Sequence, residues 1–195
     1  MIEILQSGGR TTLQDAGRPG NRHMGIPASG AADKLSFALA NWMAGNPWDA
    51  PALECVWGGQ HVRFLQDRTI AIAGAEMAAQ VNGRNIRNFT ALSVKAGDIL
   101  TFSRARQGSR AYLALAGGLY GENFMGSVST YITAGIGGLD GTALKVGDRL
   151  EAGLDYEERQ IIPPGYQPRI SNHIVLRSRP APEYNELSQA SQRHI

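Results

Sequence analysis

Residues Thr11–Asp33, TTLQDAGRPGNRHMGIPASGAAD, combine side chains that bind anions with glycines that let a backbone approach a ligand. Arg18 and Arg22 can each pair with a carboxylate or phosphate in a fixed fork geometry. His23 can move a proton near neutral pH, and Asp15 can orient an arginine or act as a base. This combination suits a small acidic substrate or a carboxylated intermediate.

Ser29 lies where this stretch leads into a predicted helix. Its hydroxyl can cap the first turn, and the same helix N-terminus could receive an anion. A stretch rich in Gly, Pro and Arg before a helix is also typical of a plain structured loop, in which His23 makes only local hydrogen bonds. The residues alone leave both interpretations open.

A second glycine-dense segment, Gly117–Leu144, carries a run of hydroxyls. Ser127, Ser129 and Thr130 belong to this run. A loop of this length without periodicity is uncommon in a compact domain unless it is functional or mobile. The alternative is that these hydroxyls satisfy the backbone of their own turn.

The elements that must position these residues are mostly short strands. Helical spacing predicts one prominent helix over residues 31–44, with Ser29 as its N-cap and Gly45 ending it. Asn82-Gly83 is the strongest hairpin signal. The strand candidates are Ile2–Gln6, Ala52–Trp57, Gln60–Gln66, Thr69–Ala73, Met77–Val81, Arg84–Thr90, Ile99–Arg104, Arg110–Ala114 and Ile174–Leu176. The pattern predicts a mainly β protein, as a barrel or sandwich.

The predicted helix places Ala32, Leu35, Leu39, Trp42 and Met43 on one face, which we expect to pack on the core. Two segments, VKAGDILTF (Val94–Phe102) and LKVGDRLEA (Leu144–Ala152), repeat one pattern. Their common part predicts a tight Gly-Asp turn that feeds a strand.

Composition excludes several classes of protein. The 195 residues suit one domain, or one and a small piece of another, and a net charge of +2 gives no electrostatic support for nucleic-acid binding. Cys55 is the single cysteine, and we expect it to be buried, with Glu54 on the opposite face of the strand. The sequence lacks a secretory signal and an apolar run of about 18 residues, so we expect a cytoplasmic protein without a membrane span.

Common catalytic motifs are also missing from the sequence. There is no P-loop, no HExxH, no GxSxG and no dinucleotide fingerprint, and the four histidines are scattered. We therefore predict no metal site.

Three motifs, in order and spacing, resemble the carboxyltransferase domain family. They are the stretch Thr11–Asp33, LANWMAGNPWDAPALE, and YLALAGGLYGENFMGSVSTYITAGIGGLDGTALKVGDRL. That family includes the C subunit of ATP-dependent 5-oxoprolinase, allophanate hydrolase subunit 2, the antagonist KipA and a domain of urea carboxylase. The tail APEYNELSQASQ looks closer to the 5-oxoprolinase branch.

The resemblance implies a cyclophilin-like β-barrel and a hydrolase that opens 5-oxoproline to L-glutamate together with the A and B subunits of 5-oxoprolinase, the latter KipI-like. ATP would then act through the complex, and the substrate would be a small amide or lactam. The alternatives are a biotin-dependent carboxyltransferase of the urea carboxylase or allophanate hydrolase type, and a non-catalytic KipA-like antagonist of a kinase inhibitor. In the hydrolase, Asp15 and His23 would be catalytic, and Arg18, Arg22, Ser29, Ser127, Ser129 and Thr130 would bind substrate.

Two departures from the family pattern stand out. Val128 occupies the position where many members carry an arginine, in Gly-Ser-Arg-Ser-Thr. Family members also continue further, so we expect residues 1–153 to form the N-terminal part of the domain, and residues 154–195 a connecting segment and the start of a truncated second half. A truncated chain could be inactive alone.

Overall fold

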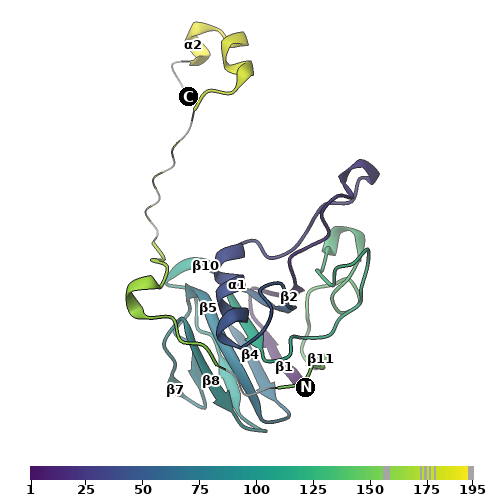
Figure 1. The fold of residues 1–195 in the computed structure, drawn as a ribbon, viewed down its shortest axis with the longest axis vertical. Helices are drawn as coiled ribbons and strands as arrows, with labels where there is room; N and C mark the ends of the chain where they lie inside the picture. The colour runs from purple at the N-terminus through teal and green to yellow at the C-terminus, as the bar shows by residue number, and fades with distance from the viewer. Residues whose placement is uncertain (156–158, 172, 174, 176, 178, 193–195) are drawn as a thin grey trace.

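Two antiparallel sheets pack face to face in the computed structural model, which describes residues 1–155, 159–171, 173, 175, 177 and 179–192 (Figure 1). The six-stranded sheet runs in the order β11 (Arg149–Leu150), β1 (Ile2–Ser7), β4 (Gln60–Phe64), β9 (Ile99–Thr101), β6 (Gln80–Val81) and β7 (Arg84–Asn85). The five-stranded sheet runs in the order β2 (Arg10–Gln14), β3 (Ala52–Val56), β10 (Gln107–Leu115), β5 (Arg68–Glu76) and β8 (Thr90–Val94).

The main core lies between the inner faces of the two sheets. In the five-stranded sheet Leu13, Leu53 and Leu113 stand in one register row, and all three are fully buried. Phe64 and Val62 are equally buried and belong to the same core from the other sheet. The mainly β architecture with one prominent helix is therefore confirmed, and the paired strands form two open sheets rather than one closed ring.

The helix α1 (Lys34–Met43) covers the outer face of the five-stranded sheet (Figure 1). Phe37 and Met43 are buried there and pack against alanines of the sheet. The Phe37 ring contacts the Tyr112 ring edge-on, with 5.7 Å between the ring centroids. The predicted face is only partly in the core: Met43 is buried and Leu39 packs against the core, but Leu35 and Trp42 are exposed. Small residues in the sheet admit the Phe37 side of the helix, and periodicity alone cannot distinguish two apolar faces of one helix.

The start of α1 also differs from the prediction. Asp33 is the N-cap, and its carboxylate accepts a hydrogen bond from the Ser36 N–H at 3.1 Å. Ser29 lies upstream with φ +54°, so it does not cap the helix. Both residue types cap helices well, and tertiary contacts choose between them. Gly45 follows the helix at φ +76°, as predicted.

The strand β2 is absent from the predicted elements, because residues 10–14 carry little apolar periodicity. Thr11 and Thr12 are buried strand residues, and threonine lacks the apolar character on which periodicity depends. The Asn82-Gly83 hairpin is confirmed between β6 and β7, with positive φ at both residues. The predicted strand Ile174–Leu176 falls largely outside the described residues.

The two segments that share the Gly-Asp pattern form the same type of turn. The Lys95 N–H and the Lys145 N–H each donate to the carboxylate of an aspartate three residues on, both at 2.8 Å. The following glycines have φ of +92° and +91°, and their N–H groups donate to the carbonyls of Phe64 and Ile4, on neighbouring strands. The two turns thus anchor β9 and β11 in the same way on the six-stranded sheet.

The chain after β11 crosses back over the five-stranded sheet. The Asp155 carboxylate accepts from the Thr69 N–H, the Gln160 N–H donates to the Met43 carbonyl, and Ile162 is buried in the core under α1. Short helical segments follow at η3 (Pro164–Tyr166), η4 (Pro182–Glu186) and α2 (Gln189–Gln192). Among the described residues, no helix has the length and apolarity needed to cross a membrane.

Candidate functional site

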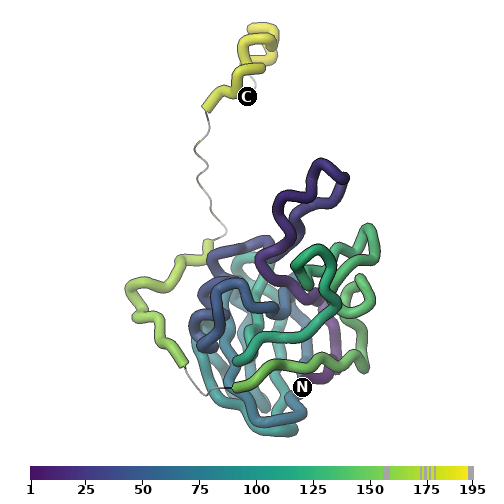
Figure 2. Tube along the Cα trace, turned by 45° about the vertical axis from the view of Figure 1, so that its right-hand side comes forward, coloured from purple at the N-terminus to yellow at the C-terminus, as the bar shows by residue number. Residues whose placement is uncertain are grey.

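Residues 16–30 form an arm that projects from the sheets beside the glycine-rich loop, residues 117–144 (Figures 1 and 2). Its two sides meet where the Arg18 N–H donates to the Ala28 carbonyl and the Ala31 N–H donates to the Asp15 carbonyl. Gly17 must be glycine, because a Cβ there would lie 2.4 Å from the Ala28 carbonyl oxygen. The arm turns at η1 (Arg22–Met24), which forms its tip.

Asp15 joins the arm to the glycine-rich loop. Its Oδ1 accepts from the Gly17 N–H and the Ser127 hydroxyl, both at 2.7 Å, and from the Ser129 hydroxyl. Its Oδ2 accepts from the Val128 N–H at 2.7 Å. The Asp15 N–H donates back to Ser129 Oγ at 3.0 Å. We call Asp15, Ser127, Val128 and Ser129 the Asp15 clamp, and four internal donors engage its carboxylate.

Arg18 is the second link between the arm and the loop, and its side chain is 1% exposed. Its Nε donates to the Phe124 carbonyl at 3.1 Å and its Nη2 to the Ser129 carbonyl at 2.5 Å, while the guanidinium lies over the Phe124 ring. Burial lowers the pKa of Arg18, and the charge of Asp15 opposes that shift. Nη1 is buried without a hydrogen-bond partner in the described part of the chain.

Thr130 continues the contact along the free edge of β2. Its N–H and its hydroxyl both donate to the Leu13 carbonyl, and Gln14 Nε2 donates to the Thr130 carbonyl. These bonds satisfy an edge that would otherwise expose unpaired backbone groups. The loop is thus fixed to the sheet at several points.

The structure therefore divides the predicted site residues into two sets. Asp15, Arg18, Ser127, Ser129 and Thr130 come together in a buried network at the base of the arm. The hydroxyls in this network hydrogen-bond within the protein, so the observed contacts of the network position the arm and the loop. The predicted roles of these five residues toward substrate stay predictions.

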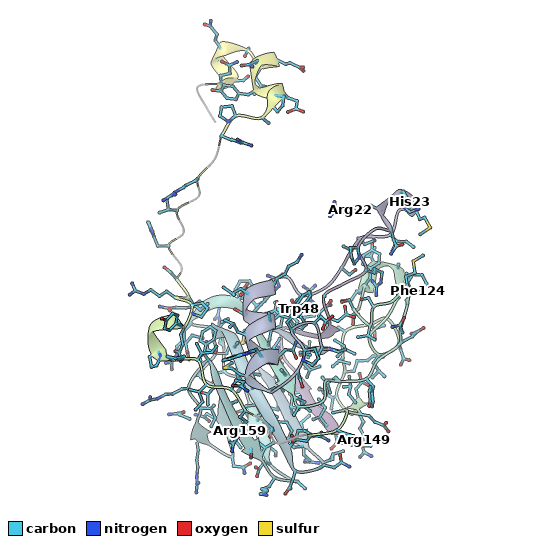
Figure 3. The ribbon with its side chains drawn as sticks, in the orientation of Figure 1. Arg22, His23, Trp48, Phe124, Arg149 and Arg159 are labelled. Atoms are coloured by element: carbon cyan, nitrogen blue, oxygen red, sulfur yellow. The ribbon has the colours of Figure 1, made fainter. Side chains whose placement is uncertain are left out.

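The second set lies on the arm itself. Arg22 and His23 are exposed at its tip, above Phe124 of the loop (Figure 3). His23 Nδ1 lies 3.1 Å from the Gly20 carbonyl oxygen. Ser29 stands on the returning side of the arm, half-buried. Arg22 and His23 are thus accessible to a ligand without any movement of the core.

Sequence reasoning missed a third cluster, where the arm enters α1. Glu54 Oε2 accepts from the Ala32 N–H at 2.9 Å and from the Tyr112 hydroxyl at 2.8 Å, and Oε1 lies 3.4 Å from Arg110 Nε. The Tyr112 hydroxyl accepts from the Asp33 N–H at 2.8 Å. The register of β3 and β10 pairs Glu54 with Tyr112. This register cannot be deduced from the local sequence pattern, so no local signal could have revealed the cluster.

Replacing Tyr112 by phenylalanine is expected to lower the free energy of unfolding at pH 8 by roughly 1–3 kcal/mol. The buried Glu54 carboxylate would lose one donor, and the Asp33 N–H would lose its acceptor. Urea denaturation measures the change, with Tyr120→Phe as the control because Tyr120 is 60% exposed. Equal stability of the two variants would contradict the role of Tyr112.

The same measurement across alkaline pH tests the burial of two ionisable groups. Burial raises the pKa of Cys55 to about 12, and burial with the neighbouring Glu54 charge raises the pKa of Tyr112. Above the ordinary values of about 8.5 and 10, the unfolded chain releases protons that the folded chain keeps. The free energy of unfolding should therefore fall as pH rises above about 9, less steeply for Tyr112→Phe. A flat profile would contradict this expectation.

Among the described residues, no group of three or more His, Cys, Asp or Glu side chains is placed to hold a metal ion. The exposed Arg22 guanidinium at the tip of the arm is of a type that pairs with carboxylates.

Comparison with known proteins identifies the family. Residues 24–195 match the family described as the carboxyltransferase domain, subdomain A and B. The chain belongs to the carboxyltransferase domain family. It is 41% identical to the C subunit of 5-oxoprolinase from Escherichia coli (strain K12) over 192 residues, which cover 98% of this chain and 61% of that protein.

Urea-metabolising members of the family are also similar. The urea amidolyase of Lachancea kluyveri is 37% identical over 170 residues, which cover 86% of this chain and 9% of that protein. The crystal structure of the K. lactis urea amidolyase matches with a TM-score of 0.83 and 34% identity, over 88% of this chain and 11% of that one. This carboxyltransferase domain chain therefore corresponds to a part of several larger proteins.

Proposed function

We propose that this chain acts as the C subunit of an ATP-dependent 5-oxoprolinase, which opens the 5-oxoproline lactam to L-glutamate together with the A and B subunits. The observation that carries the proposal is the 41% identity to a 5-oxoprolinase C subunit across 98% of this chain. The likeness to the L. kluyveri urea amidolyase is lower and covers less of the chain, at 37% over 86%.

The arm supports this proposal through the groups at its tip. The lactam carries a carboxylate, for which the exposed Arg22 guanidinium is a suitable bidentate partner. His23 would exchange protons as the amide bond opens. Asp15 and Arg18 would act as positioning residues that hold the arm against the glycine-rich loop. Such fixed geometry is how an enzyme lowers the entropic part of a barrier. ATP would enter through the complex.

A biotin-dependent carboxyltransferase that acts on urea or a similar amide is the second candidate. The observation in its favour is the TM-score of 0.83 with the K. lactis urea amidolyase. Both reactions handle a planar amide and a carboxylate, so the same arm would serve either one.

Reconstitution separates the candidates. The chain is combined with the A and B subunits of 5-oxoprolinase, and glutamate release from 5-oxoproline is measured with and without ATP. The proposal expects ATP-dependent glutamate release that avidin does not inhibit. Avidin-sensitive carboxylation of urea would support the second candidate. Binding to the KipI-like partner without any turnover would support a KipA-like antagonist instead.

Replacing Arg22 or His23 by alanine is expected to lower the kcat/KM of the reconstituted complex by about tenfold or more, because each removes a group from the proposed substrate contact. Both residues are exposed, so the melting temperature should change little. Arg84→Ala, at an exposed position of β7, is the matched control. Unchanged kcat/KM in both arm variants would remove the arm tip from the site.

A further inference from the structure

Trp57, in the connection between β3 and β4, is held in an unusual position. Its side chain is 62% exposed, and its φ is +64°, a conformation that is costly for a bulky residue. The backbone is fixed on both sides, because the Trp57 N–H donates to the Ser109 carbonyl and the Ala105 N–H donates to the Trp57 carbonyl. The fold thus maintains a strained backbone while presenting an indole to solvent.

Four arginines lie near Trp57 in the strand register or in the segment bonded to it. Arg10 of β2 and Arg110 of β10 both stand opposite Val56, the residue before Trp57, in the register of the sheet. Arg104 and Arg106 flank the Ala105 that is bonded to the Trp57 carbonyl. We call Arg10, Trp57, Arg104, Arg106 and Arg110 the Trp57 patch.

Three of the patch residues, Arg104, Arg106 and Arg110, come from a basic stretch of the chain. Residues 77–121 contain six basic residues and one acidic residue: Arg84, Arg87, Lys95, Arg104, Arg106 and Arg110 against Asp98. Glu54 and Glu76 both contact residues of the patch. Glu54 is buried and pairs with Arg110, and Glu76 accepts a hydrogen bond from the Ala78 N–H. The exposed Arg10, Arg104 and Arg106 outnumber these acids, so the patch is positively charged.

We propose that the Trp57 patch is a docking surface for an acidic face of a partner subunit, a proposal that rests on the function proposed above. Tryptophan and arginine are the residue types that most often dominate the binding energy of protein interfaces. Arginines gathered at one place attract a partner of opposite charge and raise the rate of association. A second copy of this chain would bring the same positive cluster, so a different, acidic chain is the occupant that fits.

A pair of tryptophan variants tests the apolar part of the surface. Trp57→Ala is compared with Trp48→Ala, because Trp48 is 61% exposed but lies in the connection between α1 and β3. The affinity for the A and B subunits of 5-oxoprolinase is measured by titration calorimetry and size exclusion. We expect Trp57→Ala to weaken assembly by about tenfold or more and Trp48→Ala to leave it unchanged. Equal affinities in both variants would overturn the proposal.

Charge reversal tests the electrostatic part. The double variant Arg104→Glu with Arg106→Glu should not assemble with the partner subunits. The affinity of the wild-type chain should decrease as the salt concentration rises from about 50 to about 500 mM. Circular dichroism confirms that each variant is folded. The proposal would be overturned if assembly were insensitive to salt, to Trp57→Ala and to the double arginine variant. It would also be overturned if this chain bound ATP and Trp57→Ala abolished that binding while assembly persisted. If wild-type chain fails to assemble with these partners, the proposed function itself fails.

Discussion

Replacing Asp15 by asparagine is expected to lower the free energy of unfolding by about 3 kcal/mol and to loosen the glycine-rich loop. An amide has one acceptor oxygen, so it cannot serve both the three donors at Oδ1 and the Val128 N–H at Oδ2. Whichever way the asparagine turns, its NH2 group faces a donor, and buried groups on the loop lose their partner.

Urea denaturation gives the change in stability, and hydrogen exchange at the Val128 N–H reports the loop directly. Asp49→Asn is the matched control, because Asp49 is exposed. The expected exchange rate rises by about tenfold or more at Val128 and stays unchanged in the control. A fully protected Val128 N–H in the Asp15 variant would show that the clamp does not hold the loop.

Replacing Arg18 by methionine should have an effect of similar size, about 3 kcal/mol, for a different reason. Methionine fills much of the space of the aliphatic stem but leaves the buried Ser129 carbonyl without its donor, and the Phe124 carbonyl keeps only the Ser127 N–H. Arg18→Lys should restore less than half of the loss, because one ammonium cannot reproduce a planar fork that spans two carbonyls.

Arg10→Met is the control for this substitution, since Arg10 is exposed. Thermal and urea unfolding measure the series. Lysine at position 18 that restores full stability would show that charge alone, and not the geometry of the guanidinium, links the arm to the loop.

The sequence was informative where residues act locally. The Asn82-Gly83 hairpin and the two Gly-Asp turns depend on φ preferences of neighbouring residues, and both were predicted correctly. The N-cap of α1 shows the limit of local prediction, because Ser29 was predicted and Asp33 is the N-cap. Both residue types can cap a helix, and the hydrogen bonds that attach the end of the arm to Tyr112 and Glu54 determine which residue does so.

The candidate site was predictable as a set of residue types but not as an arrangement. The residues Asp15 and Ser129 are separated by 114 positions in the chain, so their contact depends on the path of the whole sheet. Exposure of Arg22 and burial of Arg18, four residues apart, follow from the shape of the arm, which glycines at 17, 25 and 30 create. The Glu54–Tyr112 pair needed the strand register.

A chimera tests the central claim most directly. The 192 residues of the E. coli 5-oxoprolinase C subunit that align with this chain are replaced by the chain itself, and the remainder of the E. coli protein is kept. The chimera is combined with the E. coli A and B subunits. The account predicts ATP-dependent release of glutamate from 5-oxoproline, lowered by about tenfold or more when Arg22 is alanine. A folded chimera that assembles with both partners and releases no glutamate would contradict it.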